Sequence, residues 1–529
     1  MPPFLPTLRL PLTPLRAFAC LALGVVSVAQ GDWRTEGEFD KLSVELGTAM
    51  PTGAGVVGLM SEVDADPGAG LSYLPQATAV TPYAGAGSFA GKTIYADHGV
   101  GGASGHAVST ASTFCTADYS VSPGITELHM LDAETFFNEL YTTAAPLTYA
   151  GRVHNHSWVA DSTGDQTADE RVLRKLDMIS DRDGVLTCIP LMNYSTSAFP
   201  PFLANAYNAV TVGLRSGEHA RGGSNTDGAG RMKPDLVVDE VYTSLASPAV
   251  ASTAALLLDA ADPAHPLAVN PRVIKALLCT AASKEALPAW HRANDAAPYD
   301  AVYGAGVLNV RHAFWILNQG RQTYSTAVER LSLGWDANTT AASNSSRRYF
   351  FSVPSGSSAK TFSASLTWHR TITRNVFGQF SATLQNLDLR LYAATGFSPG
   401  AQPIAQSLST VDNVEHVFLR HLPAGQYMLE VKGSASGTPY GLAWEAAVGA
   451  GPEVSVGRDA GTGGVILHCL HLDPFATYQI ESSTTLIGQW DIETTFRTAD
   501  TTASFTHDWS DPVVSVVPKF YRLRWATVR

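Results

Sequence analysis

The stretch Thr243-Ser244-Leu245-Ala246-Ser247-Pro248 is followed at once by an unbroken run of small and apolar residues, Ala249-Val250-Ala251-Ser252-Thr253-Ala254-Ala255-Leu256-Leu257-Leu258. A run of this kind predicts a buried helix, and Ser244 lies where that helix begins. The helix dipole and the free N–H groups of a first turn favour negative charge on a reacting oxygen. Ser244 is therefore a candidate nucleophile.

Length and composition limit the class of protein. A chain of 529 residues is too long for one compact core, so we expect two to four domains. A hydrophobic fraction of 45% with 16% charged residues is typical of a folded protein. The net charge of -12, without a dense Lys/Arg cluster, argues against nucleic acid as a partner.

The N-terminus resembles an export signal. Arg9 and Arg16 precede the apolar stretch 17–28, and Ser27-Val28-Ala29 places small residues at the positions that a signal peptidase reads. The apolar stretch has 12 residues, fewer than the ~20 needed to cross a bilayer. We therefore expect a signal peptide over residues 1–29, a secreted, periplasmic or cell-surface protein, and no integral membrane segment once the signal is removed.

Cysteine spacing leaves the disulfides open. Cys20 falls in the expected signal, and the other four, Cys115, Cys188, Cys279 and Cys469, could form up to two disulfides in any of three full pairings. No metal-type Cys spacing is present.

The hydrophobic pattern divides the rest of the chain. After a short N-terminal segment, 30–52, strand-like and helix-like runs alternate over residues 53–318, which predicts an α/β domain whose mostly parallel sheet is flanked by helices. From 319 to 449 the period changes to two, as in Leu387–Tyr392, which predicts a β-sandwich. Residues 450–529 are predicted to form a second, small β domain. The change of pattern near 319 suggests that the α/β domain folds without the regions that follow it.

The Ser244 stretch resembles the nucleophile segment of the subtilisin-like serine proteases, Gly-Thr-Ser-x-Ala-Ser/Thr-Pro at the opening of a buried helix. The residues Tyr303-Gly304-Ala305-Gly306-Val307-Leu308-Asn309 resemble the turn that closes such domains, and the β-sandwich resembles the jelly-roll domains that often follow secreted members. One departure is Tyr242, which stands where the family usually has glycine.

His106 takes the place of the general base in this resemblance. The family's motif is His-Gly-Thr-His-Val-Ala-Gly, and here Ala107, Val108 and Ser109 replace the three residues after the first histidine. An imidazole suits the role because its unperturbed pKa lies near the working pH. His98 is the alternative base, but no helix of small residues follows it.

The acid of the triad has two candidates. Residues 53–66 resemble the family's first strand, whose end carries an aspartate. Counting from Gly53 favours Glu62, whereas a carboxylate followed by a small residue at the strand exit favours Asp64. Residues two apart in a strand face the same side, so both could reach His106. We prefer Asp64 and keep Glu62 as the alternative.

Asn193 and the stretch Asn155-His156-Ser157-Trp158 complete the resemblance. Asn193 ends an apolar strand, where the family places the asparagine that holds the oxyanion, although Tyr194 follows it in place of glycine. The second stretch resembles the strand that lines the substrate cleft, where an extended peptide pairs with a strand edge. Ser157 and Trp158 are therefore candidate substrate-binding residues, with a core tryptophan as the alternative for Trp158.

Together these residues imply a secreted serine endopeptidase that acts on polypeptides through an acyl-enzyme, as a monomer and without a cofactor for the chemistry. Family members often bind structural calcium, but no acidic loop specifies it here. Two other classes remain open. The replacements at Tyr242, Ala107 and Tyr194 favour a catalytically impaired binding or scaffolding protein. The aromatic residues Trp490, Phe520 and Tyr521 favour an adhesin whose β domains bind a ligand.

Overall fold

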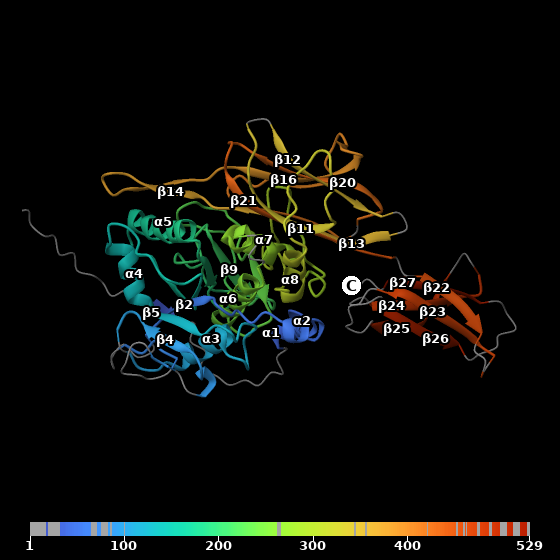
Figure 1. Cartoon of the computed structure of the whole chain (residues 1–529), viewed down its shortest axis with the longest axis horizontal. Helices are drawn as coiled ribbons and strands as arrows, with labels where there is room; N and C mark the ends of the chain where they lie inside the picture. Colours follow the sequence, from blue (N-terminus) through green and yellow to red (C-terminus); the bar gives the residue numbers. More distant parts are fainter. Residues whose placement is uncertain are drawn as a thin grey trace, which may run out of the picture.

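The protein consists of an α/β body, a β-sandwich packed on it and a small β domain beyond the sandwich (Figure 1). The computed structural model describes residues 17–19, 32–64, 71–75, 83–84, 87–99, 101–261, 266–342, 345–354, 357–420, 422–450, 453–458, 461, 463–472, 477–485, 489–497, 505–511 and 519–525.

The α/β body is built on one eight-stranded sheet. Its strands are β2 (Val57–Glu62), β3 (Tyr83–Ala84), β4 (Thr93–Ala96), β5 (Glu127–Asp132), β6 (Val153–His156), β8 (Leu186–Pro190), β9 (Ala209–Leu214) and β10 (Leu236–Val238). They lie in the order β10-β9-β8-β6-β2-β5-β4-β3, and all neighbours are parallel except the edge pair β3 and β4. The predicted mostly parallel sheet is therefore confirmed, and its carboxyl ends meet at one edge.

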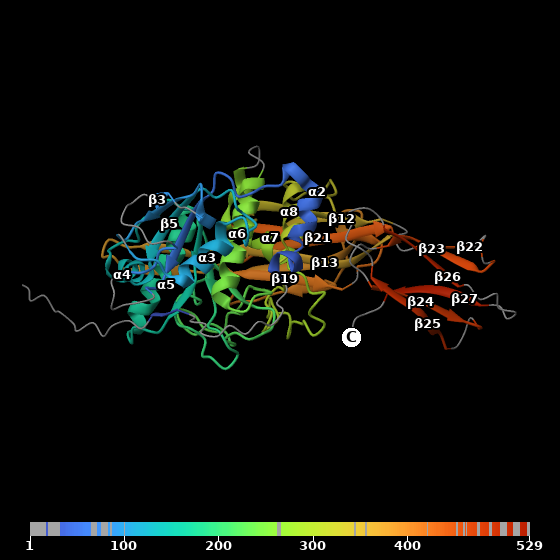
Figure 2. The same cartoon turned by 90° about the horizontal axis from the view of Figure 1, so that it is seen from below.

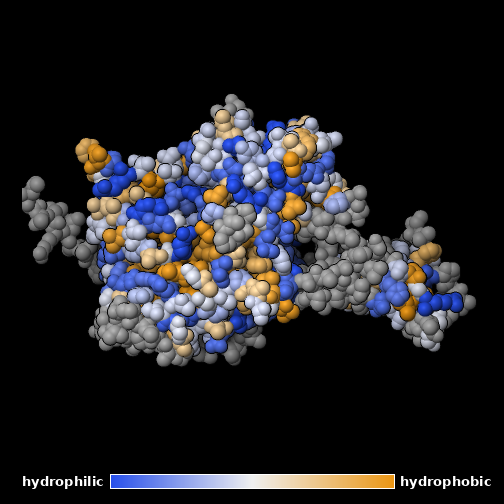
Figure 3. All heavy atoms as spheres, in the orientation of Figure 1, coloured by the Kyte–Doolittle hydropathy of each residue, from blue (hydrophilic) through white to orange (hydrophobic). Residues whose placement is uncertain are grey.

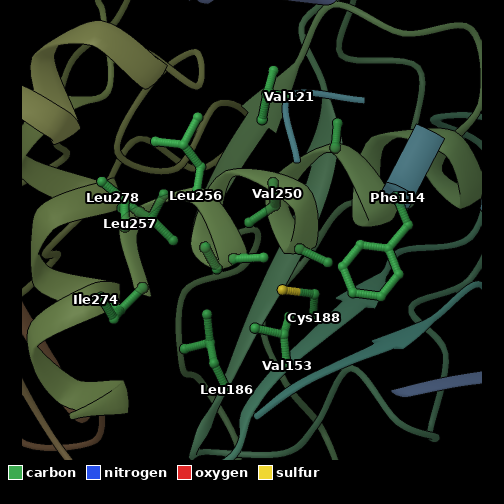
Figure 4. Close-up of a cluster of buried hydrophobic side chains, with 14 of the residues drawn as sticks. Phe114, Val121, Val153, Leu186, Cys188, Val250, Leu256, Leu257, Ile274 and Leu278 are labelled. Carbon is green, nitrogen blue, oxygen red and sulfur yellow. The ribbon is translucent and has the colours of Figure 1, made fainter. Parts of the chain in front are cut away.

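Helices cover both faces of this sheet. Helices α3 (Gly105–Cys115), α6 (Thr243–Ala260), α7 (Pro271–Ala281) and α8 (Val310–Asn318) share one core with the side chain of Met60, whereas α4 (Ala133–Thr142) and α5 (Gln166–Asp183) share the other with Leu59. Adjacent residues of a strand face opposite sides, so β2 contributes to both cores. Figure 4 shows Val250 and Leu257 of α6 in the first core, beside Val153 of β6 and Leu186 of β8.

The N-terminal segment belongs to the same body. Helices α1 (Trp33–Glu36) and α2 (Phe39–Leu46) pack near α8, and the carbonyl of Gly37 accepts a hydrogen bond from Val310 N at 2.8 Å. Glu45 of α2 accepts bonds from Arg311 Nε and Trp315 Nε1 at 2.6 and 2.9 Å. Short 3-10 turns lie at Gly47–Ala49, Gly87–Phe89 and Pro266–Val269.

The predicted β-sandwich is present as two antiparallel sheets. One has the order β11-β21-β13-β19, and the other has the order β12-β20-β16-β17 with β18 beside β16. The strands are β11 (Leu333–Thr339), β12 (Ser346–Val353), β13 (Ser357–Trp368), β16 (Leu387–Thr395), β17 (Ser398–Pro399), β18 (Ala405–Ser407), β19 (Val414–Leu419), β20 (Gly425–Gly433) and β21 (Pro439–Ala450). Their inward side chains form a separate core that includes Trp368 and Trp444.

Helix α7 lies between the parallel sheet and the sandwich, and packs against β13 and β21 (Figures 1 and 2). Ser363 Oγ donates to the carbonyl of Thr280 at 2.7 Å, and a Cβ on Gly441 would lie 2.5 Å from the Arg272 backbone. Arg370 follows β13 and bonds Asp177 of α5 at 2.5 Å. The sequence suggested that the α/β domain folds independently, whereas the structure shows a close interface between this domain and the sandwich.

A hairpin formed by β14 (Thr371–Arg374) and β15 (Phe380–Thr383) extends from the sandwich toward α5. Its turn carries Val376 and Phe377, which are 92% and 86% exposed. The turn projects from the surface at the upper left of Figure 3, where the hydrophobic colour is strong. Phe380 at the root is buried, with Lys175 of α5 over its ring at 5.6 Å.

The C-terminal region forms two three-stranded sheets, β22-β23-β26 and β25-β24-β27. The strands are β22 (Glu453–Arg458), β23 (Val465–Leu472), β24 (Thr477–Ser483), β25 (Asp491–Arg497), β26 (Phe505–Asp511) and β27 (Phe520–Trp525). The predicted second β domain is therefore present.

The remaining predictions concern the termini and cysteines. The expected signal, residues 1–29, lies outside the described residues except for β1 (Ala17–Ala19). Cys115, Cys188, Cys279 and Cys469 are all free and buried, so the disulfides considered above do not form. In the described part of the chain, no helix is both long enough and apolar enough to span a membrane.

Candidate active site

Glu62 and His106 meet at the carboxyl edge of the sheet. Glu62 is the last residue of β2 and is fully buried. His106 is the second residue of α3, whose N-cap Ser104 accepts a bond from Ala107 N at 3.3 Å. The two side chains bond through His106 Nδ1 and Glu62 Oε2 at 2.7 Å. A carboxylate on Nδ1 fixes the tautomer that leaves Nε2 free to accept a proton.

The carboxylate of Glu62 also shifts the pKa of His106. Burial of the ring opposes protonation, but the charge of Glu62 and its hydrogen bond outweigh burial and raise the pKa of His106 above its ordinary value. Nε2 of His106 is buried and has no hydrogen-bond partner in the described part of the chain. An unpaired buried nitrogen of this kind is available to a reacting group.

Asp64, the preferred acid, has a different partner. Its Oδ1 accepts bonds from the N and Oγ of Ser72 at 3.0 and 2.5 Å. The carboxylate that bonds His106 in the structure is thus that of Glu62, the alternative acid. Strand β2 ends at Glu62, so the alternation that would place Asp64 on the same side no longer applies two residues later.

His98, the alternative base, also has other neighbours. Its Nδ1 lies 3.2 Å from the carbonyl oxygen of Asp132, and its Nε2 lies 3.4 Å from Glu139 Oε1. Both ring nitrogens are therefore engaged toward β5 and α4.

Ser244 is the second residue of α6 and is 2% exposed. Helix α6 packs against α3, which carries His106. No acceptor is found among the described residues for the backbone N–H of Ser244, as expected for a free first-turn donor. Because Nε2 of His106 has no partner, the Ser244 hydroxyl is not bonded to it here. Nucleophile and base are often farther apart before substrate binds.

The start of α6 is held by two polar side chains, that of Asn155 in β6 and that of Ser157, which lies between β6 and β7 (Trp158–Ala160). Pro248 has no N–H, so it cannot donate to the carbonyl of Ser244, four residues earlier. Ser157 Oγ donates to that carbonyl instead, at 2.9 Å. Asn155 Nδ2 donates to Ser157 Oγ at 2.9 Å, and Asn155 Oδ1 accepts from Ser247 Oγ at 2.8 Å.

Asn193 lies beside the same helix start. Its Oδ1 accepts a bond from Thr243 N at 2.9 Å, and the Thr243 hydroxyl lies 2.9 Å from the same oxygen. A backbone N–H can only donate, so the carboxamide oxygen must face Thr243 and the NH2 group must face the other way. Tyr194 has a φ of 72°, a left-handed conformation that glycine adopts more easily.

The two predicted substrate-binding residues are buried. Trp158 is fully buried, and its Nε1 donates to Ser61 Oγ at 2.6 Å, while Ser61 Oγ lies 2.7 Å from His156 Nδ1. The burial of Trp158 thus favours the alternative interpretation, a core tryptophan, over a wall of the specificity pocket. Ser157 is also fully buried and contacts the helix start. Alternation along a strand does not reveal that both faces of β7 are covered.

The backbone edge of β7 does pair with an extended segment. Strand β1 runs antiparallel to it, with Ala17 opposite Ala160 and Ala19 opposite Trp158. The main chain of β7 therefore forms a ladder with a second strand, and substrate binding at this stretch stays a prediction.

Sequence reasoning missed two parts of the site. Thr110 of α3 donates its hydroxyl to Glu62 Oε1 at 2.7 Å, and Asn155 and Ser247 form the chain that leads to Ser244. Thr110 stands four residues after His106, so it lies on the same face of a helix, which the sequence alone indicates. In the described part of the chain, no group of three or more His, Cys, Asp or Glu residues could hold a metal ion.

The aromatic residues considered for ligand binding are half-buried. Trp490, Phe520 and Tyr521 are all of intermediate exposure. Tyr521 packs against Trp509 and donates its hydroxyl to Asp511 Oδ2 at 2.8 Å.

No protein-family model and no curated protein matches this chain. Among solved structures, it is similar to fervidolysin from Fervidobacterium pennivorans, a keratinolytic enzyme related to subtilisin, with 14% identity, a TM-score of 0.34, and coverage of 87% of this chain and 67% of that one. It is also similar to tripeptidyl peptidase 2, with 11% identity, a TM-score of 0.29, and coverage of 80% and 52%. A lanthipeptide protease is similar with 13% identity, a TM-score of 0.34, and coverage of 54% and 94%. At TM-scores this low, the likeness carries no inference about activity, which depends on the side chains described above.

Proposed function

We propose that the protein is a secreted serine endopeptidase that uses Ser244 as nucleophile, His106 as general base, Glu62 as the acid that orients His106, and Asn193 as an oxyanion donor. The observation that carries the proposal is the bond between His106 Nδ1 and Glu62, which leaves the buried Nε2 of His106 without a partner. This arrangement prepares an imidazole to accept a proton from a serine.

In the proposed reaction, His106 Nε2 takes the proton of Ser244 Oγ as that oxygen attacks the peptide carbonyl. The developing oxyanion receives hydrogen bonds from the Ser244 backbone N–H and the Asn193 NH2 group. The proton then passes from His106 to the leaving amine, and a water molecule, activated in the same way, releases the acyl group from Ser244. The extended substrate adds to the edge of β7, where β1 lies in the structure.

The test is covalent labelling of the purified protein with a fluorophosphonate probe, followed by peptide mapping. We expect one modified residue, Ser244, together with hydrolysis of casein at neutral to alkaline pH. Ser244→Ala should abolish both. Thr253→Ala is a control on the same helix, because the Thr253 hydroxyl donates to the Ala249 carbonyl and not to the residues around Ser244, and it should keep its label.

A folded wild-type protein that is neither labelled nor active would overturn the proposal. The left-handed Tyr194 beside Asn193 favours the alternative in that event, a catalytically impaired binding or scaffolding protein.

A further inference from the structure

The carboxylate of Glu62 has two oxygens, and each has a different donor. Oε2 bonds His106, and Oε1 accepts the hydroxyl of Thr110 at 2.7 Å. Glu62 and Thr110 are both fully buried, so water does not reach the second oxygen. A buried carboxylate oxygen without a donor is costly, more so than a neutral acceptor.

Both donors come from one rigid element. His106 and Thr110 are four residues apart on α3, so they lie on the same face of the helix, and the helical backbone fixes the distance between them. The Thr110 hydroxyl also lies 3.0 Å from the carbonyl of His106 and 3.3 Å from that of Ala107, which are the alternative acceptors within the helix. A hydroxyl has one proton, and a charged acceptor forms the stronger bond, so we assign the proton to Glu62.

A glutamate needs such a second contact more than an aspartate does. Its carboxylate is separated from the backbone by one more rotatable bond, and a bond to His106 alone leaves rotation about that axis open. The Thr110 bond fixes the plane of the carboxylate relative to the imidazole. Precise orientation of the acid matters because it holds the ring in the reactive tautomer.

We propose that Thr110 is a positioning residue of this active site: its hydroxyl holds the Glu62 carboxylate in the plane that orients His106 toward Ser244. This inference rests on the proposed function, and it adds a fifth side chain to Ser244, His106, Glu62 and Asn193.

The test compares steady-state kinetics of the full chain with those of Thr110→Val, which keeps the shape of the side chain but removes the donor. We expect kcat to fall about 10- to 100-fold, the effect of losing one bond to a buried charged group, while KM changes little. Thr110→Ser should restore most of kcat. Thr113→Val is the matched control, because Thr113 lies on the same helix but donates to the Ser109 carbonyl, and its kcat should stay within about twofold of the wild type.

A double-mutant cycle separates positioning from support of the fold. In a Glu62→Gln background, Thr110→Val should lower kcat by a smaller factor than in the wild type, because the two residues act through one contact. An equal factor in both backgrounds would overturn the inference, and so would a wild-type kcat in Thr110→Val. If Thr110→Val does not fold, Thr110→Ala is measured by the same criteria.

The two proposals fail in different ways. An unlabelled, inactive wild type contradicts the proposed function. A labelled, active wild type whose Thr110→Val variant is equally active contradicts only the role of Thr110.

Discussion

Two carboxylates lie two residues apart near the end of β2, and their surroundings give them different roles. Glu62 faces His106 and Thr110, whereas Asp64 binds Ser72 in the segment that follows the strand. We expect Glu62→Gln to lower kcat by about 10³- to 10⁴-fold, because the amide no longer fixes the His106 tautomer. Asp64→Asn should cost less than about tenfold, the size of a screened through-space effect.

The pH dependence of kcat/KM provides a second readout of the same variants. The general base works as the neutral imidazole, so kcat/KM should rise as the pH increases through the pKa of His106. That pKa is raised by Glu62, and the acid limb should therefore lie above the ordinary histidine value of about 6.5. Glu62→Gln should move the limb to lower pH, and Asp64→Asn should leave it in place. The reverse pattern would return the acid's role to Asp64.

Sequence reasoning named Ser244 and His106 as candidates, and it left Asp64 and Glu62 as alternatives for the carboxylate that holds His106. Ser244, which stands four residues before Pro248, and the run of small residues after that proline form a distinctive pattern. The residues near Glu62 and Asp64 do not show where β2 ends, and the end of the strand decides which carboxylate faces the histidine. The sequence left Trp158 open between a specificity pocket and the core for a related reason, since burial on both faces of a short strand depends on distant segments.

At the scale of the element, α6 begins with a carbonyl that its own helix cannot satisfy. Pro248 removes the donor to the Ser244 carbonyl, and Ser157 supplies another. We expect Ser157→Ala to lower the free energy of unfolding by about 1–3 kcal/mol, the cost of a buried acceptor without a partner. Urea unfolding monitored by circular dichroism measures this change.

The control for Ser157→Ala lies in the same helix. Pro248→Ala restores an N–H that can reach the Ser244 carbonyl, so Ser157→Ala should cost less in that background. Equal losses of stability with and without Pro248 would show that Ser157 stabilises the fold by some other contact. The sequence reveals the missing donor at Pro248, but only the packing of β6 and of Ser157, which follows it, against α6 reveals its replacement.

At the scale of the whole molecule, the α/β body and the sandwich share buried charges. Arg370 of the sandwich region pairs with Asp177 and Asp227, and all three side chains are almost fully buried. We expect a chain that ends at residue 320 to be insoluble or unfolded, because it leaves two buried carboxylates without Arg370 and exposes the face of α7. A chain that ends at residue 450 is the control, and it should keep its activity. Hydrolysis by the shorter chain would contradict this expectation.

The interface between the α/β body and the sandwich differs from the independent folding of the α/β domain that the sequence suggested. A change of hydrophobic period near residue 319 marks a change of secondary structure, but it does not show whether the outer face of α7 meets water or another sheet. The contact requires small residues such as Gly441, because a side chain at that position would collide with the backbone of Arg272. The sequence alone does not show why glycine stands there, since the partner is known only from the structure.

The four buried cysteines have a consequence for where this fold can form. Burial raises the pKa of Cys115 and of Cys279 to about 11, so at neutral pH these thiols are not thiolates and react slowly with oxidants and alkylating agents. None of the four is in a disulfide in the described fold, and all four are buried. The described fold therefore needs no thiol oxidase or disulfide isomerase, and it should form equally well in a reducing cytosol and in an oxidising compartment.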